Sequence, residues 1–132
     1  MFDLSVLGWV ALGGALGAVL RVVATRAVSR RQGDDFPFGT LWVNYSGALV
    51  GGLLIGFGLS MTGFDHGFEA FWLFGLVGSY TTVSTLGLEW LELVRRDRLA
   101  KAMTYLGASL IGGVVLALAG ILAGLGLSSL VR

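Results

Sequence analysis

Long apolar segments alternate with short polar ones along this chain. The apolar segments cover about residues 4–24, 41–61, 68–94 and 103–131. Each segment reaches the roughly 20 residues that a helix needs to cross a hydrocarbon core about 30 Å thick. The polar connections are short, so consecutive segments must run antiparallel. The pattern predicts an all-α membrane protein in which residues 1–132 form a single domain of four transmembrane helices.

Composition supports a domain surrounded by lipid. Hydrophobic residues make up 55% of the 132 positions and charged residues only 13%, too few to cover the surface of a soluble domain of this size. The 22 glycines allow helices in lipid to approach one another closely. The net charge of +1 argues against nucleic acid as a partner, because binding phosphates needs many clustered cations. The absence of cysteine excludes disulfides and thiolate metal sites.

Basic side chains gather on one side of the predicted bundle. Four antiparallel spans place the first and third connections on the same side, and these carry eight cations: Arg21, Arg26, Arg30, Arg31, Arg95, Arg96, Arg98 and Lys101. The opposite side has only Arg132. By the positive-inside rule the chain inserts in one orientation in the inner (cytoplasmic) membrane, with both termini outside the cytoplasm.

Polar residues interrupt the third apolar segment. The stretch GSYTTVSTLGLEW, residues 78–90, places glycine, hydroxyl groups and Glu89 where a simple span would carry leucine. Glycine, serine and threonine weaken a helix locally, and a broken helix frees backbone groups that need another partner inside a membrane. Freed carbonyls suit a cation, whereas amide and hydroxyl hydrogens suit an anion. We predict a broken third helix, against the alternative of a continuous helix whose hydroxyls bond their own backbone. Glu89 is expected to cap a helix or to pair with an arginine.

Polar residues also occur in the second and fourth segments, and some of them have two interpretations. Thr40 is expected to cap the second helix, and Asn44 lies one turn later on the same face. The Asn44 amide either bonds a neighbouring helix or presents N–H donors to an anion. Tyr105 and Ser109 share a helix face and either line a polar track or link helices.

Small residues repeat at a four-residue spacing in the first segment. Gly13 pairs with Gly17, and Gly14 pairs with Ala18. Such repeats favour close packing against another helix over contact with a solute.

The sequence has no pattern typical of an enzyme. It contains no Ser/His/Asp set, no metal-ligand spacing and no phosphate-binding loop, and His66 stands alone in a connection. We therefore expect neither catalysis nor an organic cofactor.

Four stretches together resemble the small fluoride channels called Fluc or CrcB. The stretches are GGALGAVLR, FPFGTLWVN, GLVGSYTTVSTLGLE and the pair Tyr105 and Ser109, in the same order and at fitting spacings over nearly the whole chain. The resemblance implies a fluoride-selective channel that exports fluoride passively across the cytoplasmic membrane. It also implies an antiparallel (inverted) dimer of four-helix subunits, with two narrow pores along the interface.

The resemblance assigns roles to individual residues. The main-chain carbonyls of Gly78 and Thr81 match a structural sodium site at the centre of the dimer. The positions that match the pore and its hydroxyl-rich segment are Asn44, Thr82, Ser84, Thr85, Tyr105 and Ser109. Closely placed hydrogen-bond donors are what a small, strongly hydrated anion needs in exchange for its water.

Two positions of the hydroxyl-rich segment depart from the family pattern, and Gly113 in the fourth segment stands where the family commonly has another serine. Val83 and Leu86 stand where the family has phenylalanines whose electropositive ring edges face the ion. A homodimer of inverted subunits also requires a chain that inserts both ways, whereas this chain has a strong charge bias. We therefore expect a heterodimer whose second subunit has the opposite orientation and supplies the phenylalanines; a homodimer with an unusual pore is the alternative.

Two other functions compete with the fluoride channel. One is a proton-coupled exporter similar to the small multidrug transporters, which need a carboxylate deep in the first span; here only Asp3 lies near its start. The other is a non-conducting structural subunit of a heterodimeric channel, which would fit the loss of the phenylalanines at Val83 and Leu86.

The orientation can be tested with reporters that are active on one side of the membrane only. A reporter after Arg132 is expected outside the cytoplasm, and a reporter inserted at Asp97, in the third connection, is expected inside. An even mixture of both sides for either reporter would contradict insertion in one orientation.

Overall fold

All described elements of this computed structural model are helices. The structure describes residues 4–33, 35–60 and 65–131. The long helices are α1 (Leu4–Gln32), α2 (Phe38–Ser60) and α6 (Leu99–Val131). The third apolar segment is divided into α3 (His66–Glu69), the π-helix η1 (Ala70–Val77), α4 (Gly78–Tyr80) and α5 (Ser84–Arg95). Four helical segments of the described chain are long and apolar enough to cross a membrane, which confirms an all-helical chain with four candidate spans.

The first helix extends further than the hydropathy pattern predicts. It runs to Gln32, eight residues beyond the expected end at residue 24. Its terminator is Gly33, which has a φ of 77° and donates its N–H to the Ser29 carbonyl at 2.9 Å. The first four arginines therefore lie on α1 itself rather than in a connection.

The second helix also begins earlier than expected. Its first residue is Phe38, directly after Pro37. Thr40 therefore lies inside the first turn, and the expectation that it caps this helix is wrong.

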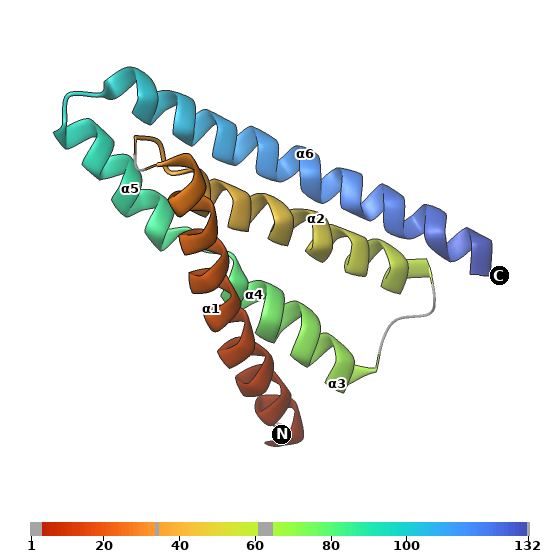
Figure 1. Ribbon diagram of the computed structural model, residues 1–132. Coiled ribbons are helices and arrows are strands. Elements are labelled where there is room, and N and C mark those ends of the chain that lie inside the picture. Colours follow the sequence, from red (N-terminus) through yellow and green to blue (C-terminus); the bar gives the residue numbers. More distant parts are fainter. Residues whose placement is uncertain (1–3, 34, 61–64, 132) are drawn as a thin grey trace.

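Glycines bring the α2 and α6 backbones into direct contact along most of their length (Figure 1). A Cβ at Gly56 would lie 2.1 Å from the Ile121 carbonyl oxygen, and one at Gly120 would lie 2.3 Å from the Leu49 carbonyl oxygen. Neither position can take a larger residue unless the backbones move apart. In lipid, where no water is expelled between helices, such close packing is a main source of helix association.

The first helix crosses the third segment in a similar way (Figure 1). A Cβ at Gly13 would lie 2.2 Å from the Phe71 carbonyl oxygen, and one at Gly17 would lie 2.2 Å from the Leu76 carbonyl oxygen. These contacts confirm that Gly13 and Gly17 serve close helix packing.

Much of the surface is apolar, and the buried hydrophobic core is small. Its described members are Val43, Ala70, Leu93, Ala102 and Tyr105. Along α6, Ile111 and Leu122 are each 69% exposed and Val114 is 60% exposed. A surface of this kind needs lipid or another membrane chain to cover it.

An ion-pair cluster joins two connections at one end of the bundle. Asp35, between α1 and α2, bonds both Arg98 and Lys101, which lie where α5 passes into α6. The hydrogen bond from Lys101, followed by that from Arg98, lowers the pKa of the Asp35 carboxyl below its ordinary value. The first and third connections therefore share one end, here called the basic end. Arg132 lies outside the described residues.

The close packing of α2 on α6 can be tested by adding single methyl groups to α6. Gly120→Ala is expected to lower the free energy of unfolding by about 1–3 kcal/mol, because the new Cβ overlaps the α2 backbone. Gly126→Ala is the matched control, since a Cβ there meets nothing within 4 Å. The measurement is denaturant unfolding in detergent. Equal stability of both variants would contradict the contact.

Candidate functional site

Helical structure stops within the third segment, between α4 and α5. Helix α4 ends at Tyr80 and α5 begins at Ser84, so residues 81–83 belong to neither helix. Thr81 has an extended backbone, with φ −77° and ψ 157°. Here residues 81–83 are called the interruption. Its backbone groups need partners other than the usual carbonyls four residues earlier.

The side chain of Asn44, on α2, supplies two of these partners. Its Nδ2 donates to the Thr82 carbonyl at 2.9 Å, and its Oδ1 accepts the Thr82 N–H at 2.8 Å. In a continuous helix that N–H would donate to the Gly78 carbonyl. Asn44 thus links α2 to the interruption. This is the first of its two sequence-based interpretations, a bond to a neighbouring helix.

The Thr82 side chain organises the start of α5. Its Oγ1 accepts the Thr85 N–H at 3.2 Å, donates to Thr85 Oγ1 at 3.1 Å and lies 3.2 Å from Ser84 Oγ. In a continuous helix the Thr85 N–H would donate to the Thr81 carbonyl. The Thr82 hydroxyl therefore acts as a helix cap, because it accepts an N–H of the first turn of α5.

The bonds made by Asn44 and by Thr82 Oγ1 remove the usual helical donors from two carbonyls. These are the carbonyls that match a sodium site by resemblance. The N–H that would bond Gly78 goes to Asn44, and the N–H that would bond Thr81 goes to Thr82 Oγ1. Carbonyl oxygens released at an unwound helix are suitable ligands for Na⁺. The chemistry of these two residues therefore fits a bound sodium ion.

A groove runs between α2, the interruption and α6. Its volume is 580 Å³. Its lining includes the polar residues Asn44, Thr81, Thr82 and Ser109, together with Gly78. Gly47 permits close approach here, because a Cβ would lie 2.3 Å from Thr81 Cγ2. Five of the sequence-predicted site residues thus share one groove.

Ser109 has an unpaired hydroxyl in that groove. The residue is 8% exposed, and its Oγ is buried with no hydrogen-bond partner in the described part of the chain. A buried hydroxyl without a partner costs about 1–3 kcal/mol, so such groups are rare in folded proteins. Ser109 therefore offers a free donor to whatever occupies or covers the groove.

The two family departures also line the groove, in different ways. Val83 is 82% exposed, so its side chain projects away from its own subunit. Leu86 is partly buried and packs against the cluster of Leu93, Ala102 and Tyr105.

Tyr105 lies away from the groove and binds Glu89 instead. It is fully buried, and its hydroxyl donates to Glu89 Oε2 at 2.7 Å. Thr40 Oγ1 donates to the other oxygen, Oε1, at 2.8 Å. Glu89 is thus held by hydroxyls from α2 and α6 and neither caps a helix nor pairs with an arginine among the described residues. This cluster was not predicted from the sequence, since Thr40 lies 49 residues from Glu89.

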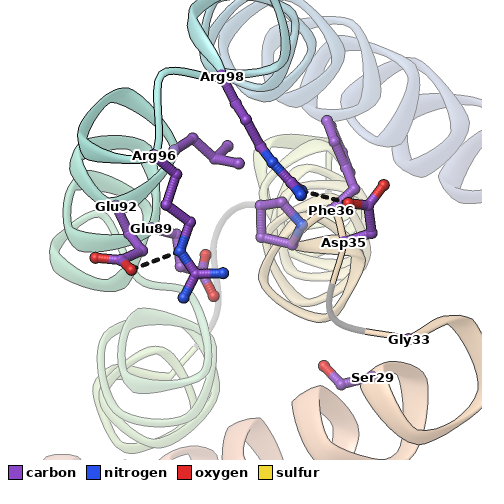
Figure 2. Close-up of a pocket in the computed structure, with 10 residues that line it drawn as sticks. Ser29, Gly33, Asp35, Phe36, Glu89, Glu92, Arg96 and Arg98 are labelled. Atoms are coloured by element: carbon purple, nitrogen blue, oxygen red, sulfur yellow. Dashed lines mark hydrogen bonds and ion pairs between the residues drawn. The ribbon is translucent and has the colours of Figure 1, made fainter.

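Glu89 also borders a small polar pocket at the basic end (Figure 2). The pocket has a volume of 210 Å³. Its charged lining also includes Asp35 of the first connection, Glu92 of α5, and Arg96 and Arg98 of the third connection. Arg96 pairs with Glu92 at 2.7 Å, one helical turn away. Figure 2 shows Glu89 and the Glu92–Arg96 pair on one side of the pocket and Asp35 on the other.

This architecture defines a small multi-pass membrane protein with a groove between its spans that carries amide and hydroxyl groups. A family model described as "CrcB-like protein, Camphor Resistance (CrcB)" matches residues 8–121. The chain therefore belongs to the CrcB family.

Several curated relatives carry the name "Fluoride-specific ion channel FluC". One from Paracoccus denitrificans is 40% identical over 116 residues, covering 88% of each chain. One from Anaeromyxobacter sp. (strain K) is 38% identical over 110 residues, covering 83% of this chain and 87% of the relative. One from Nitrobacter winogradskyi is 35% identical over 116 residues, covering 88% and 89%.

The hydroxyls of Thr40 and Tyr105 that hold Glu89 are here called the hydroxyl clamp. The clamp can be tested with a double-mutant cycle. Tyr105→Phe is expected to lower the free energy of unfolding by about 1–2 kcal/mol, because one carboxylate oxygen loses its donor. In a Glu89→Met background the same substitution should cost little or stabilise, because the hydroxyl has then lost its acceptor. Unfolding in detergent measures both. Equal costs in the two backgrounds would contradict the clamp.

Proposed function

We propose that this chain is one subunit of a fluoride-selective channel that lets fluoride leave the cell passively. Membership of the CrcB family and the names of the relatives support this class of function. The observation that carries the proposal is the groove, which sets amide and hydroxyl groups along helices whose other surfaces are apolar. Inside a membrane such groups need polar partners, and an ion that has lost its water is one.

Two donors in the groove remain available for an anion. Ser109 Oγ is buried and unpaired in the described chain. The Asn44 amide has two N–H hydrogens, of which one serves the Thr82 carbonyl. The proposed pathway therefore uses Ser109 and the second hydrogen of Asn44 directly.

The other four predicted pore residues act indirectly, by holding the groove in place. Thr82, Ser84 and Thr85 form a hydroxyl network that fixes the start of α5. Tyr105 gives its single hydroxyl hydrogen to Glu89. We assign these four residues the role of positioning the groove.

The proposed partner is a second subunit in the opposite orientation. The groove is open, and the apolar side chain of Val83 projects from it. Neither Val83 nor Leu86 can present a ring edge to an anion, so the partner is expected to supply phenylalanines there. The eight cations expected on one side of the membrane favour a different chain as partner, because a chain with this bias does not insert both ways.

A structural sodium ion belongs to the same proposal. The carbonyls of Gly78 and Thr81 would hold it together with counterpart oxygens of the inverted subunit. The ion would compensate backbone groups that have lost their helical donors. It would also fix the centre of the interface.

The function can be tested by fluoride efflux from liposomes, recorded with a fluoride-selective electrode. Fast efflux is expected when the chain is reconstituted with an inverted partner of opposite Lys/Arg bias, and chloride efflux should stay slow. Dependence on a proton gradient would support an exporter instead. That outcome is not expected, because α1 carries no carboxylate that could bind the coupled proton. No efflux in any mixture would support a non-conducting subunit.

Ser109→Ala is the sharpest variant for the pathway. It removes a donor without breaking a described hydrogen bond, so fluoride efflux should fall about tenfold while stability is kept or rises. Asn44→Leu should also impair efflux, but it breaks two bonds to the interruption as well. Ser128→Ala is the matched control. Ser128 is buried on the same helix, and among the described residues its hydroxyl bonds only the Leu125 carbonyl, in its own turn. Unchanged efflux in Ser109→Ala would remove Ser109 from the pathway.

A further inference from the structure

Aromatic side chains surround a pocket at the end of the bundle opposite the basic end. The N-terminal part of α1 and the start of the third segment meet there (Figure 1). The pocket has a volume of 370 Å³ and is lined by Trp9, Asp65, Gly67, Phe68, Phe71 and Trp72. It shares no lining residue with the groove that carries the proposed function.

Two neighbouring ring pairs of this pocket stand at steep angles. Trp9 and Phe71 have centroids 6.2 Å apart and planes at 87°. Phe71 and Trp72 have centroids 5.1 Å apart and planes at 80°. Phe68 and Trp72 have centroids 6.0 Å apart and planes at 37°, so this third pair is tilted. Rings set nearly at right angles form a corner rather than a flat stack, as in the aromatic cages that bind organic ammonium groups.

Asp65 adds a negative charge to the aromatic corner. Its Oδ2 accepts the Gly67 N–H at 3.0 Å, which leaves the other oxygen available. No lysine or arginine within residues 4–33, 35–60 and 65–131 forms an ion pair with it. A carboxylate beside ring faces favours a cation and disfavours an anion.

We propose that this pocket binds the ammonium group of a zwitterionic phospholipid headgroup. Trp9 and Trp72 are 47% and 40% exposed and lie near the ends of spanning segments, where headgroups meet the protein. Interfacial tryptophans alone are common in membrane proteins. The Asp65 carboxylate, which lines the same pocket as four aromatic rings, sets this site apart, because anchoring a helix in the interface does not require it.

Gly67 keeps the pocket open between its charged and aromatic parts. A Cβ there would lie 3.0 Å from Asp65 Oδ2 and 3.2 Å from Trp9 Nε1. An alanine would therefore fill the space between the carboxylate and the indole, and both groups would have to shift by a few tenths of an ångström.

Lipid retention measured by native mass spectrometry tests the proposal. The full-length chain, purified in detergent, is titrated with phosphatidylethanolamine, phosphatidylcholine or the anionic phosphatidylglycerol. The wild-type chain is expected to retain the two zwitterionic lipids in preference to the anionic one. Gly67→Ala and Asp65→Asn should each weaken that retention about tenfold.

Two matched controls separate the pocket from general effects. Gly8→Ala adds a methyl group next to Trp9 at a position where a Cβ meets nothing within 4 Å, so retention should stay at the wild-type level. Glu69→Gln removes a carboxylate one turn beyond Asp65 that does not line the pocket, and it should also leave retention unchanged.

Three results would overturn the proposal. Equal retention of all three lipids would remove the selectivity for an ammonium group. Unchanged retention in both Gly67→Ala and Asp65→Asn would place bound lipid elsewhere. Binding of free choline or ethanolamine without retention of either zwitterionic lipid would assign the pocket to a soluble amine. Thermal unfolding of each variant accompanies the titration, and normal stability with lost retention supports the pocket.

Discussion

The pair of hydrogen bonds between the Asn44 side chain and the Thr82 backbone is the interaction on which the candidate site depends. A backbone interruption inside a membrane costs several kcal/mol for each polar group left without a partner. Asn44 satisfies both backbone groups of Thr82, and Thr82 Oγ1 satisfies the Thr85 N–H. These bonds allow α4 and α5 to end and begin within a spanning segment. They also withdraw the helical donors of Gly78 and Thr81, the two carbonyls proposed to hold sodium.

Glycine packing places Asn44 where it can make those bonds. The α2 and α6 backbones touch at Gly56 and Gly120, and α1 touches η1 at Gly13 and Gly17. Because these contacts join backbones, they leave little freedom for the helices to slide. Gly47 then brings Thr81 against α2 three residues beyond Asn44. The same geometry leaves Ser109 buried and unpaired in the groove, which is the basis of the proposed anion pathway.

The sequence predicted those features that depend on segment length and local spacing. Four spans follow from the length of the apolar segments, and the close packing of Gly13 and Gly17 follows from their spacing. The predicted end of α1 was wrong. Hydropathy detects where lipid contact ends, whereas the helix continues until Gly33 adopts a positive φ. The clamp of Thr40 and Tyr105 on Glu89 was missed, because contacts between distant residues depend on how helices cross. The inverted partner, the sodium ion and the orientation remain predictions.

The proposed sodium site offers the most direct test of how the interruption is built. Crystals of the chain with its inverted partner would be soaked in thallium(I), a monovalent cation that scatters anomalously. The expected result is an anomalous peak bonded to the carbonyl oxygens of Gly78 and Thr81, with the Asn44 amide still on the Thr82 backbone. A Thr82 N–H that donates to the Gly78 carbonyl in an unbroken helix, with no peak nearby, would contradict it.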